Sequence, residues 1–337
     1  MTRVTIIILL SVSFLMGQFT KEGTTAAQFL KLGVGARAMS MGAAYVALTD
    51  DGTAHYWNPA GLAAFQNVGV TLMHHDWVLD IRQEYVSVAI PASKVGVLGL
   101  SMTILSMDEK EITTVRDPGG TGLYYTVRDM ALGISYARQV SDRLRIGLTG
   151  KYIGLQAHNE RAQTVAVDIG SILQTGFYGL KIGMALTNFG GNVKYDGRDL
   201  IEKSDIDDDI DGNVLTDVRL ATESWSLPIM IRIGIAGNIM GSGMALINSS
   251  SQRLTYALDA THPNDAPEHV NVGLEYALWE RLFLRMGYRY NYDLEGLTFG
   301  AGFQLPIPAL SRATIDFSVS PMELFGNTTR TSVEIRF

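Results

Sequence analysis

A stretch of the 337-residue sequence between positions 196 and 217 holds nine acidic residues. Three of them are spaced like the ligands of a calcium loop and precede the turn residue Gly212: Asp207, Asp209 and Asp211. Ca²⁺ takes about six to eight oxygen ligands, so such a spacing favours its binding. The twelfth loop position is Val218, however, where calcium loops carry a bidentate Glu. The two alternatives are a calcium site and a solvated acidic loop.

A second group of charged residues lies within long apolar stretches: Lys151, Arg232, Glu275, Arg285 and Arg289. On the polar face of a strand, these side chains would form a polar path or clamp the carboxylate of a fatty acid. The alternative is that they pair with one another or with the N-terminal segment. The adjacent His74 and His75 would bind a metal; the alternative is that they are interfacial or solvated histidines.

Several classes of function are disfavoured by composition. The absence of cysteine excludes thiolate zinc sites, disulfides and a lipid-modified cysteine. The formal charge of −7, without a basic stripe, predicts no nucleic-acid partner. The chain shows no Ser/His/Asp order, paired-carboxylate motif or phosphate-binding glycine loop, so we predict no enzyme activity. Apart from the calcium alternative, we predict no cofactor.

The chain opens with a candidate export signal. Arg3 precedes the apolar segment 4–16, which suits a signal peptide and is too short for a helix that spans a membrane. We predict cleavage after Gly17, so that residues 1–17 are the signal peptide. The alternative is a buried N-terminal strand or helix.

From about residue 67 onward, polarity alternates with a period of two. In the segment 270–278, for example, apolar residues alternate with Asn271, Gly273 and Glu275. Such alternation predicts strands with one apolar and one polar face, and their length matches the roughly 9–11 residues that cross a bilayer. We predict a closed antiparallel outer-membrane β-barrel over residues 66–337, with about 14 strands: 67–75, 81–91, 94–106, 123–138, 142–157, 161–174, 178–188, 224–238, 252–262, 267–278, 281–292, 294–306, 312–321 and 328–337.

Short and long connections alternate along this series. The long ones, 107–122 and 189–223, would face the exterior, and the short ones would be periplasmic turns. The final Phe337, after an alternating strand, resembles the signal that the barrel insertion machinery reads. The predicted location is the outer membrane of a Gram-negative-type bacterium, with outer-membrane lipid around the wall.

The N-terminal segment carries the most specific resemblance. The stretch FLKLGVGARAMSMGAAYVALTDDGTAHYWNPAGLA (29–63), with its WNPAGL element, resembles the opening of PorV/PorQ-type proteins, relatives of FadL-like outer-membrane transporters. The later stretches 262–303 and 323–337 also resemble this family. The resemblance implies a barrel of 14 strands whose N-terminal segment, residues 18–65, is a short helical plug in the lumen.

Within this plug, four residues form a candidate gate: Trp57, Asn58, Pro59 and Gly61. Proline fixes its own φ and biases the preceding residue away from helix, and glycine permits a left-handed turn. The element is either a gate or a structural junction between plug and barrel.

The resemblance implies two roles. A PorV-type barrel acts in type IX-like secretion or surface attachment, binding secreted cargo or components of the secretion system at its extracellular loops. A FadL-like barrel transports hydrophobic small molecules, such as long-chain fatty acids or hydrocarbons, past the plug. A structural surface scaffold is the third hypothesis.

Overall fold

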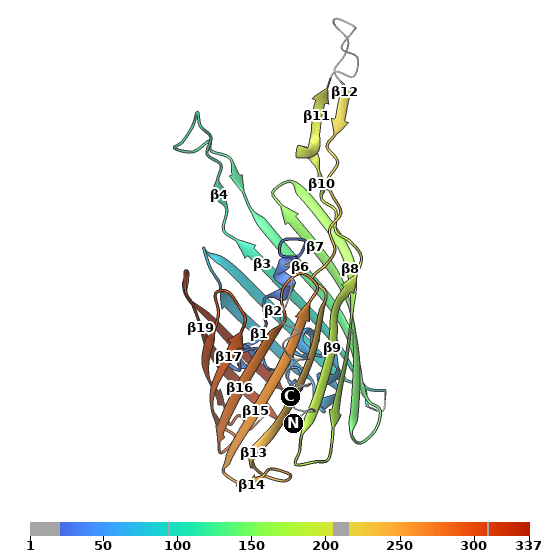
Figure 1. Ribbon diagram of the computed structural model, residues 1–337, viewed down its shortest axis with the longest axis vertical. Coiled ribbons are helices and arrows are strands. Elements are labelled where there is room, and N and C mark those ends of the chain that lie inside the picture. The colour runs from blue at the N-terminus through green and yellow to red at the C-terminus, as the bar shows by residue number, and fades with distance from the viewer. Residues whose placement is uncertain (1–20, 94, 205–215, 309) are drawn as a thin grey trace, which may run out of the picture.

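The computed structural model describes residues 21–93, 95–204, 216–308 and 310–337. Within them, fourteen antiparallel strands form a closed ring (Figure 1). Each strand pairs with the next one in the ring, and β20 pairs with β1 to close it. The ring consists of β1 (Gly69–Asp76), β2 (Ile81–Pro91), β3 (Val97–Met107), β6 (Val127–Gln139), β7 (Leu144–Ala157), β8 (Glu160–Gln174), β9 (Lys181–Gly190), β13 (Met230–Gly241), β15 (Gln252–Pro263), β16 (His269–Leu278), β17 (Leu282–Tyr290), β18 (Leu297–Gln304), β19 (Arg312–Met322) and β20 (Gly326–Arg336).

The predicted barrel is confirmed, and each predicted segment overlaps one of these strands. Two strands begin four or more residues later than predicted. Strand β6 begins at Val127 because Tyr124 and Tyr125 form β5 (Tyr124–Tyr125), which pairs with β4 (Lys110–Glu111) above the ring. Strand β13 begins at Met230, because Trp225 bridges to Val193 outside the ring and Pro228 has no N–H to donate.

The outer face of the ring is apolar and the inner face is polar. On β7, Leu148 is exposed on the outside while its neighbour Thr149 is fully buried inside. This is the reverse of a soluble sheet, and it places the apolar side chains against lipid. We call the exposed apolar side chains of the ring the apolar belt; it includes Leu72, Leu100, Ile134, Leu148, Ile169, Ile233, Leu258, Val272, Leu284, Phe299 and Ile315.

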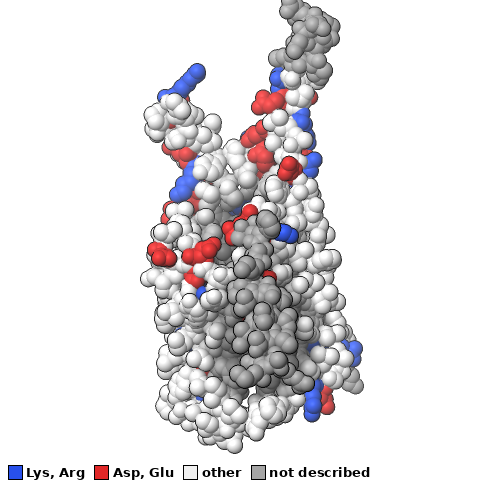
Figure 2. Space-filling view, viewed as in Figure 1, with Lys and Arg blue, Asp and Glu red and all other residues white. Residues whose placement is uncertain are grey.

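The two ends of the barrel differ. At the loop end, β4 and β5 form one hairpin, and β10 (Asp196–Gly197), η3 (Arg198–Leu200), β11 (Ile201–Ser204) and β12 (Thr216–Arg219) lead into a second one (Figure 1). The connections at the opposite turn end are shorter, and one holds β14 (Ile247–Asn248). Charged side chains concentrate on the hairpins and around the loop end, whereas the visible wall below is nearly free of them (Figure 2). The loop end therefore faces the exterior.

Residues 21–65 fill the lumen. They form four short helices: η1 (Gln28–Lys31), α2 (Ala36–Ser40), α3 (Ala54–Trp57) and η2 (Pro59–Ala64). Their apolar side chains make the main cores of the molecule; Val34, Met39 and Met41 are almost completely buried. We call residues 21–65 the plug. No helix within the described residues has the length and apolar character needed to cross a membrane.

Candidate functional site: the plug and the barrel wall

The plug starts at the loop end of the barrel, where Thr25 bridges to Ser226. Three side chains of this part converge on Asp265, in the connection between β15 and β16. The hydroxyl of Thr25 donates to Asp265 Oδ2 at 2.5 Å, Gln28 donates to the same oxygen at 2.9 Å, and Lys31 Nζ lies 2.9 Å from it. Burial alone would raise the pKa of Asp265, but these donors hold it below its usual value.

The candidate gate lies deeper in the lumen, against β7 and β8. Asn58 caps η2 by accepting a hydrogen bond from Ala60 N at 3.2 Å, with Pro59 at the first helical position. The amide of Asn58 also donates to Val46 O at 2.8 Å and to Ser171 O of β8 at 3.0 Å. Asn58 is fully buried. One side chain therefore joins two parts of the plug to the wall.

Two wall glycines make room for this element. A Cβ atom on Gly170 would lie 2.0 Å from Asn58 Oδ1, and one on Gly147 would lie 2.3 Å from the carbonyl carbon of Pro59. Gly61 fills a similar role inside the plug, since a Cβ there would lie 2.6 Å from Thr49 O. The plug therefore touches the backbone of the wall, with no side chain between them.

Trp57 connects this element to a second contact with the wall. Its indole N–H donates to Val34 O at 2.8 Å, and its ring packs edge-on against Tyr56. The guanidinium of Arg232, on β13, lies 5.3 Å from the ring centres of both aromatics. Arg232 also donates to Thr187 Oγ1 at 3.2 Å. Stacking on aromatic faces suits a buried guanidinium.

Glu275, on β16, is the centre of the largest buried charge cluster. Its carboxylate lies 2.9 Å from Arg37 Nε of α2, 2.6 Å from Arg285 Nε of β17 and 2.8 Å from Arg253 Nη1 of β15. Arg285 continues to Asp316 at 2.6 Å. The cluster thus joins the plug to several strands.

Arg37 carries the same network back into the plug. Its Nη1 atom lies 2.6 Å from Asp50 Oδ1. Burial alone would raise the pKa of Asp50, but Arg37, Arg312 and Arg336 hold it well below its usual range. Nearby, Asp259 of β15 accepts hydrogen bonds from the backbone N–H groups of Tyr45 and Val46 at 2.7 and 2.8 Å. Charged and polar wall residues thus hold the middle of the plug.

The other two lumen candidates lie apart from this cluster. Lys151 Nζ is 2.6 Å from Asp168 Oδ2 and 2.9 Å from Asn188 Oδ1. These partners sit where the register between β8 and β9 shifts, and Asn188 has a positive φ of 62°. Arg289 pairs with Glu295 near the loop end, and its guanidinium lies 3.8 Å from the ring centre of Tyr292. The structure brings Glu275 and Arg285 together, whereas Lys151, Arg232 and Arg289 each have separate partners.

The remaining candidates are the terminal Phe337 and the acidic residues of the predicted calcium loop. Phe337 is exposed at the turn end, and its N–H donates to Val68 O at 3.0 Å. Asp207, Asp209 and Asp211 lie outside the described residues, so calcium binding stays a prediction; calorimetry with Ca²⁺ on the wild type and Asp209→Ala tests it. Among the described residues, no three His, Asp or Glu side chains gather as metal ligands would.

The two neighbouring histidines have different surroundings. His74 is exposed and lies 2.6 Å from Glu84, whereas His75 is buried and its Nδ1 atom lies 3.0 Å from Gln83 Oε1. Neighbours on a strand point to opposite faces, so the pair does not form one metal site. His55, in the plug, has its Nδ1 atom 2.7 Å from Ser135 Oγ. Burial lowers the pKa of His55 to about 3, so its ring is neutral at pH 7.

Sequence reasoning missed several residues that attach the plug to the wall. On the barrel side they are Arg253, Asp259, Asp265 and Asp316, and on the plug side Arg37 and Asp50. Their partners are far away in sequence, as for Thr25 and Asp265, and meet only when the ring closes. The sequence signal that could have identified them is an acidic or basic residue at a strand position that faces the lumen. In chemical terms, the arrangement holds a plug at its start, middle and end, so moving it would break buried ion pairs.

A closed wall, an apolar belt and a lumen filled by the N-terminal segment define an outer-membrane β-barrel with a plug, placed in the bacterial outer membrane. A family model described as type IX secretion system protein PorV matches residues 17–204, more than half of the chain. The chain belongs to the PorV family. No curated protein matches the sequence.

Solved structures share the fold. The toluene transporter TodX of Pseudomonas putida has a TM-score of 0.55 and 11% identity, with 90% of this chain and 96% of that one covered. The toluene transporter TbuX of Ralstonia pickettii has a TM-score of 0.54 and 12% identity, with 90% and 98% covered. The monoaromatic hydrocarbon channel CymD has a TM-score of 0.53 and 12% identity, with 90% and 96% covered. At these identities the likeness extends to the fold.

Proposed function

We propose that this barrel takes part in type IX-like secretion or surface attachment by binding secreted cargo at its loop end. One observation carries the proposal: two hairpins stand free above a lumen that the plug fills (Figure 1). A protein partner would therefore meet the hairpins rather than the lumen. Membership of the PorV family supports the same role.

The hairpins offer both apolar side chains and backbone edges. On the first hairpin, Val115 is completely exposed, and Leu123 and Tyr124 are more than half exposed. Tyrosines such as Tyr124 are enriched among the residues that contribute most of the affinity of protein interfaces, and burying the apolar surface of Val115 and Leu123 against a partner would add to it. Within the described residues, β4 pairs only with β5, and β11 only with β12. Their outer edges would accept a strand of a β-sandwich domain.

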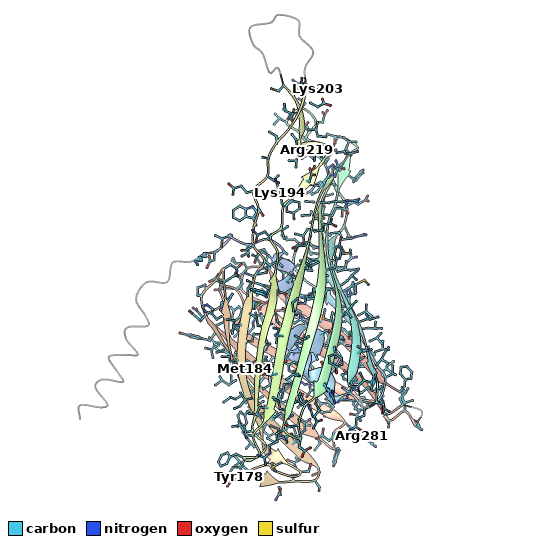
Figure 3. The ribbon with its side chains drawn as sticks, turned by 90° about the vertical axis from the view of Figure 1, so that its right-hand side faces the viewer. Tyr178, Met184, Lys194, Lys203, Arg219 and Arg281 are labelled. Atoms are coloured by element: carbon cyan, nitrogen blue, oxygen red, sulfur yellow. The ribbon has the colours of Figure 1, made fainter. Side chains whose placement is uncertain are left out.

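Exposed anchors allow a test that leaves the barrel fold intact. The triple variant Val115→Ser, Leu123→Ser and Tyr124→Ser would lose at least about tenfold in affinity for a cargo C-terminal domain, equal to about 1.4 kcal/mol. The control replaces Phe177 and Tyr178 by Ser at the turn end, where Figure 3 labels Tyr178. Binding of the cargo domain to detergent-purified protein would be measured. Equal affinities of both variants, or no binding by the wild type, would contradict the proposal.

A second function, FadL-like transport of hydrophobic small molecules, is favoured by a hollow of about 540 Å³ in the apolar belt. Leu148, Ile169, Leu186 and Ile231 lie side by side there, each paired with the next across β7, β8, β9 and β13. The plug element around Pro59 lies directly behind, against Gly147. Two of the similar structures are named as toluene transporters.

Filling this hollow would test transport. Met184, which lines the hollow and is labelled on the wall in Figure 3, would be replaced by Trp together with Leu148→Trp. Cells with this double variant would take up less radiolabelled toluene or long-chain fatty acid. Cells with the control variant Leu72→Trp, on β1, would take up both at the wild-type rate. Unchanged uptake in the filled variant would exclude this route. Retention of cargo binding in the same variant would separate the two functions.

A further inference from the structure

A second hollow on the outside of the wall lies closer to the loop end and has a volume of about 640 Å³. It is bounded by β6, β7 and β8 and by the chain that leads into β10. Strand pairing places Arg128, Gln156 and Arg161 in one row across the three strands. Lys194 comes from the segment before β10, and Figure 3 labels it above Met184, toward the hairpins.

The cations of this hollow have no acidic partner among the described residues, where no carboxylate lies within 4.0 Å of Arg128, Arg161 or Lys194. The acidic residue that lines the hollow, Asp196, is already bound by Arg219, whose Nη1 atom donates to both carboxylate oxygens at 2.7 Å. We call Arg128, Arg161 and Lys194 the cation row. Three exposed cations that face one hollow favour an anion from outside the chain.

The cation row borders the apolar belt. The next row toward the turn end is Met130, Gly154 and Gln163, and the row after it is Leu132, Tyr152 and Val165. Each row is about 7 Å further along the strands. Leu132, Tyr152 and Val165 are all exposed on the outer face. Tyr152 donates its hydroxyl proton to Gln163 Oε1 at 2.8 Å, as suits an aromatic side chain at a membrane interface.

Gly154 gives the hollow its floor. A Cβ atom there would be in ordinary van der Waals contact with Met130 at 3.5 Å and with Tyr152 at 3.7 Å, so the glycine keeps the floor low between these two side chains. In the cation row itself, Gln156 stands between the two arginines. The hollow lets one anionic group lie over Gln156 between Arg128 and Arg161, with apolar chains continuing downward past Gly154 over the belt.

We propose that the cation row binds the phosphate group of an anionic lipid in the outer leaflet, with the acyl chains of that lipid lying on Leu132 and Val165. The charge of the row matches a phosphate, and its place at the edge of the belt matches a headgroup. A free phosphate would satisfy the cations but leave the apolar rows unused. Because Lys194 lies on the segment that leads to β11, the lipid also steadies the base of that hairpin.

Native mass spectrometry of the detergent-purified barrel, incubated with lipid A as the probe, tests the site. The variant Arg128→Gln, Arg161→Gln and Lys194→Gln would bind lipid A at least about tenfold more weakly than the wild type. The control replaces three exposed cations of the turn end by Gln: Arg138, Arg143 and Arg281 (Figure 3 labels Arg281). Both variants would first be checked for the folded barrel by its gel mobility before and after heating; if the triple variant misfolds, Arg128→Gln alone is compared.

Two results would overturn the proposal. One is equal binding of lipid A by the wild type and by the cation-row variant. The other is complete displacement of lipid A by millimolar inorganic phosphate, which would assign the cations to a free anion instead of a lipid. Loss of binding in the row variant, retention in the control and resistance to inorganic phosphate together support the lipid site. The outcome does not depend on whether the hairpins bind cargo.

Discussion

Glu275 shows how single residues join the plug to the barrel. Its carboxylate is almost completely buried and contacts arginines from α2, β15 and β17. A buried charge is tolerated when partners and hydrogen bonds surround it, and its removal leaves the partners without compensation. The same carboxylate therefore stabilises both the wall and the position of the plug.

Replacing Glu275 by Gln keeps its shape and removes its charge. We expect a loss of about 3 kcal/mol in the free energy of unfolding, at the lower end of the range for a broken buried pair. The loss is moderated because Arg37, Arg253 and Arg285 each keep a second carboxylate. The matched control, Glu280→Gln, removes an exposed partner of Arg253 and would cost about 0–1 kcal/mol. Urea titration in lipid vesicles, followed by tryptophan fluorescence, measures both; equal costs would contradict the central role of Glu275.

Asp265 gives the start of the plug a dependence on pH. Its folded-state pKa lies below the unfolded value of about 3.9. The contacts with Thr25, Gln28 and Lys31 therefore stabilise the fold above that value and are lost as the pH falls through the lower folded pKa. The chain has no cysteine, so a nitroxide on Thr24→Cys reports this segment alone. We expect the label to become mobile as the pH falls below the folded-state pKa of Asp265, and to be mobile at every pH in an Asp265→Asn background.

At the scale of elements, the fit between plug and wall depends on glycines at inward positions. Two of the three glycines of β7 have different surroundings: Gly147 faces the plug, and Gly150 faces outward with no atom within 4 Å of its Cβ position. The same substitution on one strand thus separates the effect of strand propensity from the effect of the plug contact.

Gly147→Ala would force the backbone at Pro59 to shift, since the new Cβ atom would lie 2.3 Å from it. Overpacking of this kind costs about 1–3 kcal/mol. Gly150→Ala would be neutral or slightly stabilising, because it reduces the freedom of the unfolded chain at no steric cost. The temperature at which each barrel loses its compact gel mobility would show the difference. Equal unfolding temperatures of the two variants would mean that the plug backbone at Pro59 can shift at little energetic cost.

The alternation of polar and apolar residues predicts which face of a strand is buried, but it does not predict where a strand ends or which residues of the plug it contacts. Alternation identifies the face of a strand, so Leu148 and Thr149 were assignable without a structure. The alternation continues from the wall strands into the hairpins at the loop end. The predicted strand 123–138 therefore includes Tyr124, which belongs to a hairpin strand, β5. The bulge at Asn188 has no signal in the alternation. Contacts such as Asn58 with Ser171 depend on how the plug descends through a closed ring, and one sequence does not determine that path.

At the scale of the whole molecule, the apolar belt must lie in lipid and the hairpins in water. On β7 the outward positions from Leu144 to Tyr152 span about 27 Å along the strand at roughly 3.4 Å per residue. At a strand tilt of about 35–45° this covers about 19–22 Å of height, most of the roughly 25 Å apolar band of such barrels. The cation row begins just beyond it. The outer edge of the membrane therefore lies between Tyr152, at the end of the belt, and the cation row.

This placement predicts that the same substitution is costly at one exposed position and nearly neutral at another. Leu148 lies in the middle of the belt and Val115 on the first hairpin, and both are exposed in the isolated chain. Arginine at the bilayer midplane costs about 2–4 kcal/mol, so Leu148→Arg would lower the free energy of unfolding in vesicles by that amount. Val115→Arg would change it by less than about 0.5 kcal/mol, as for other surface substitutions. If Leu148→Arg were as harmless as Val115→Arg, the outer face of β7 would be in contact with water and the belt would not mark the membrane.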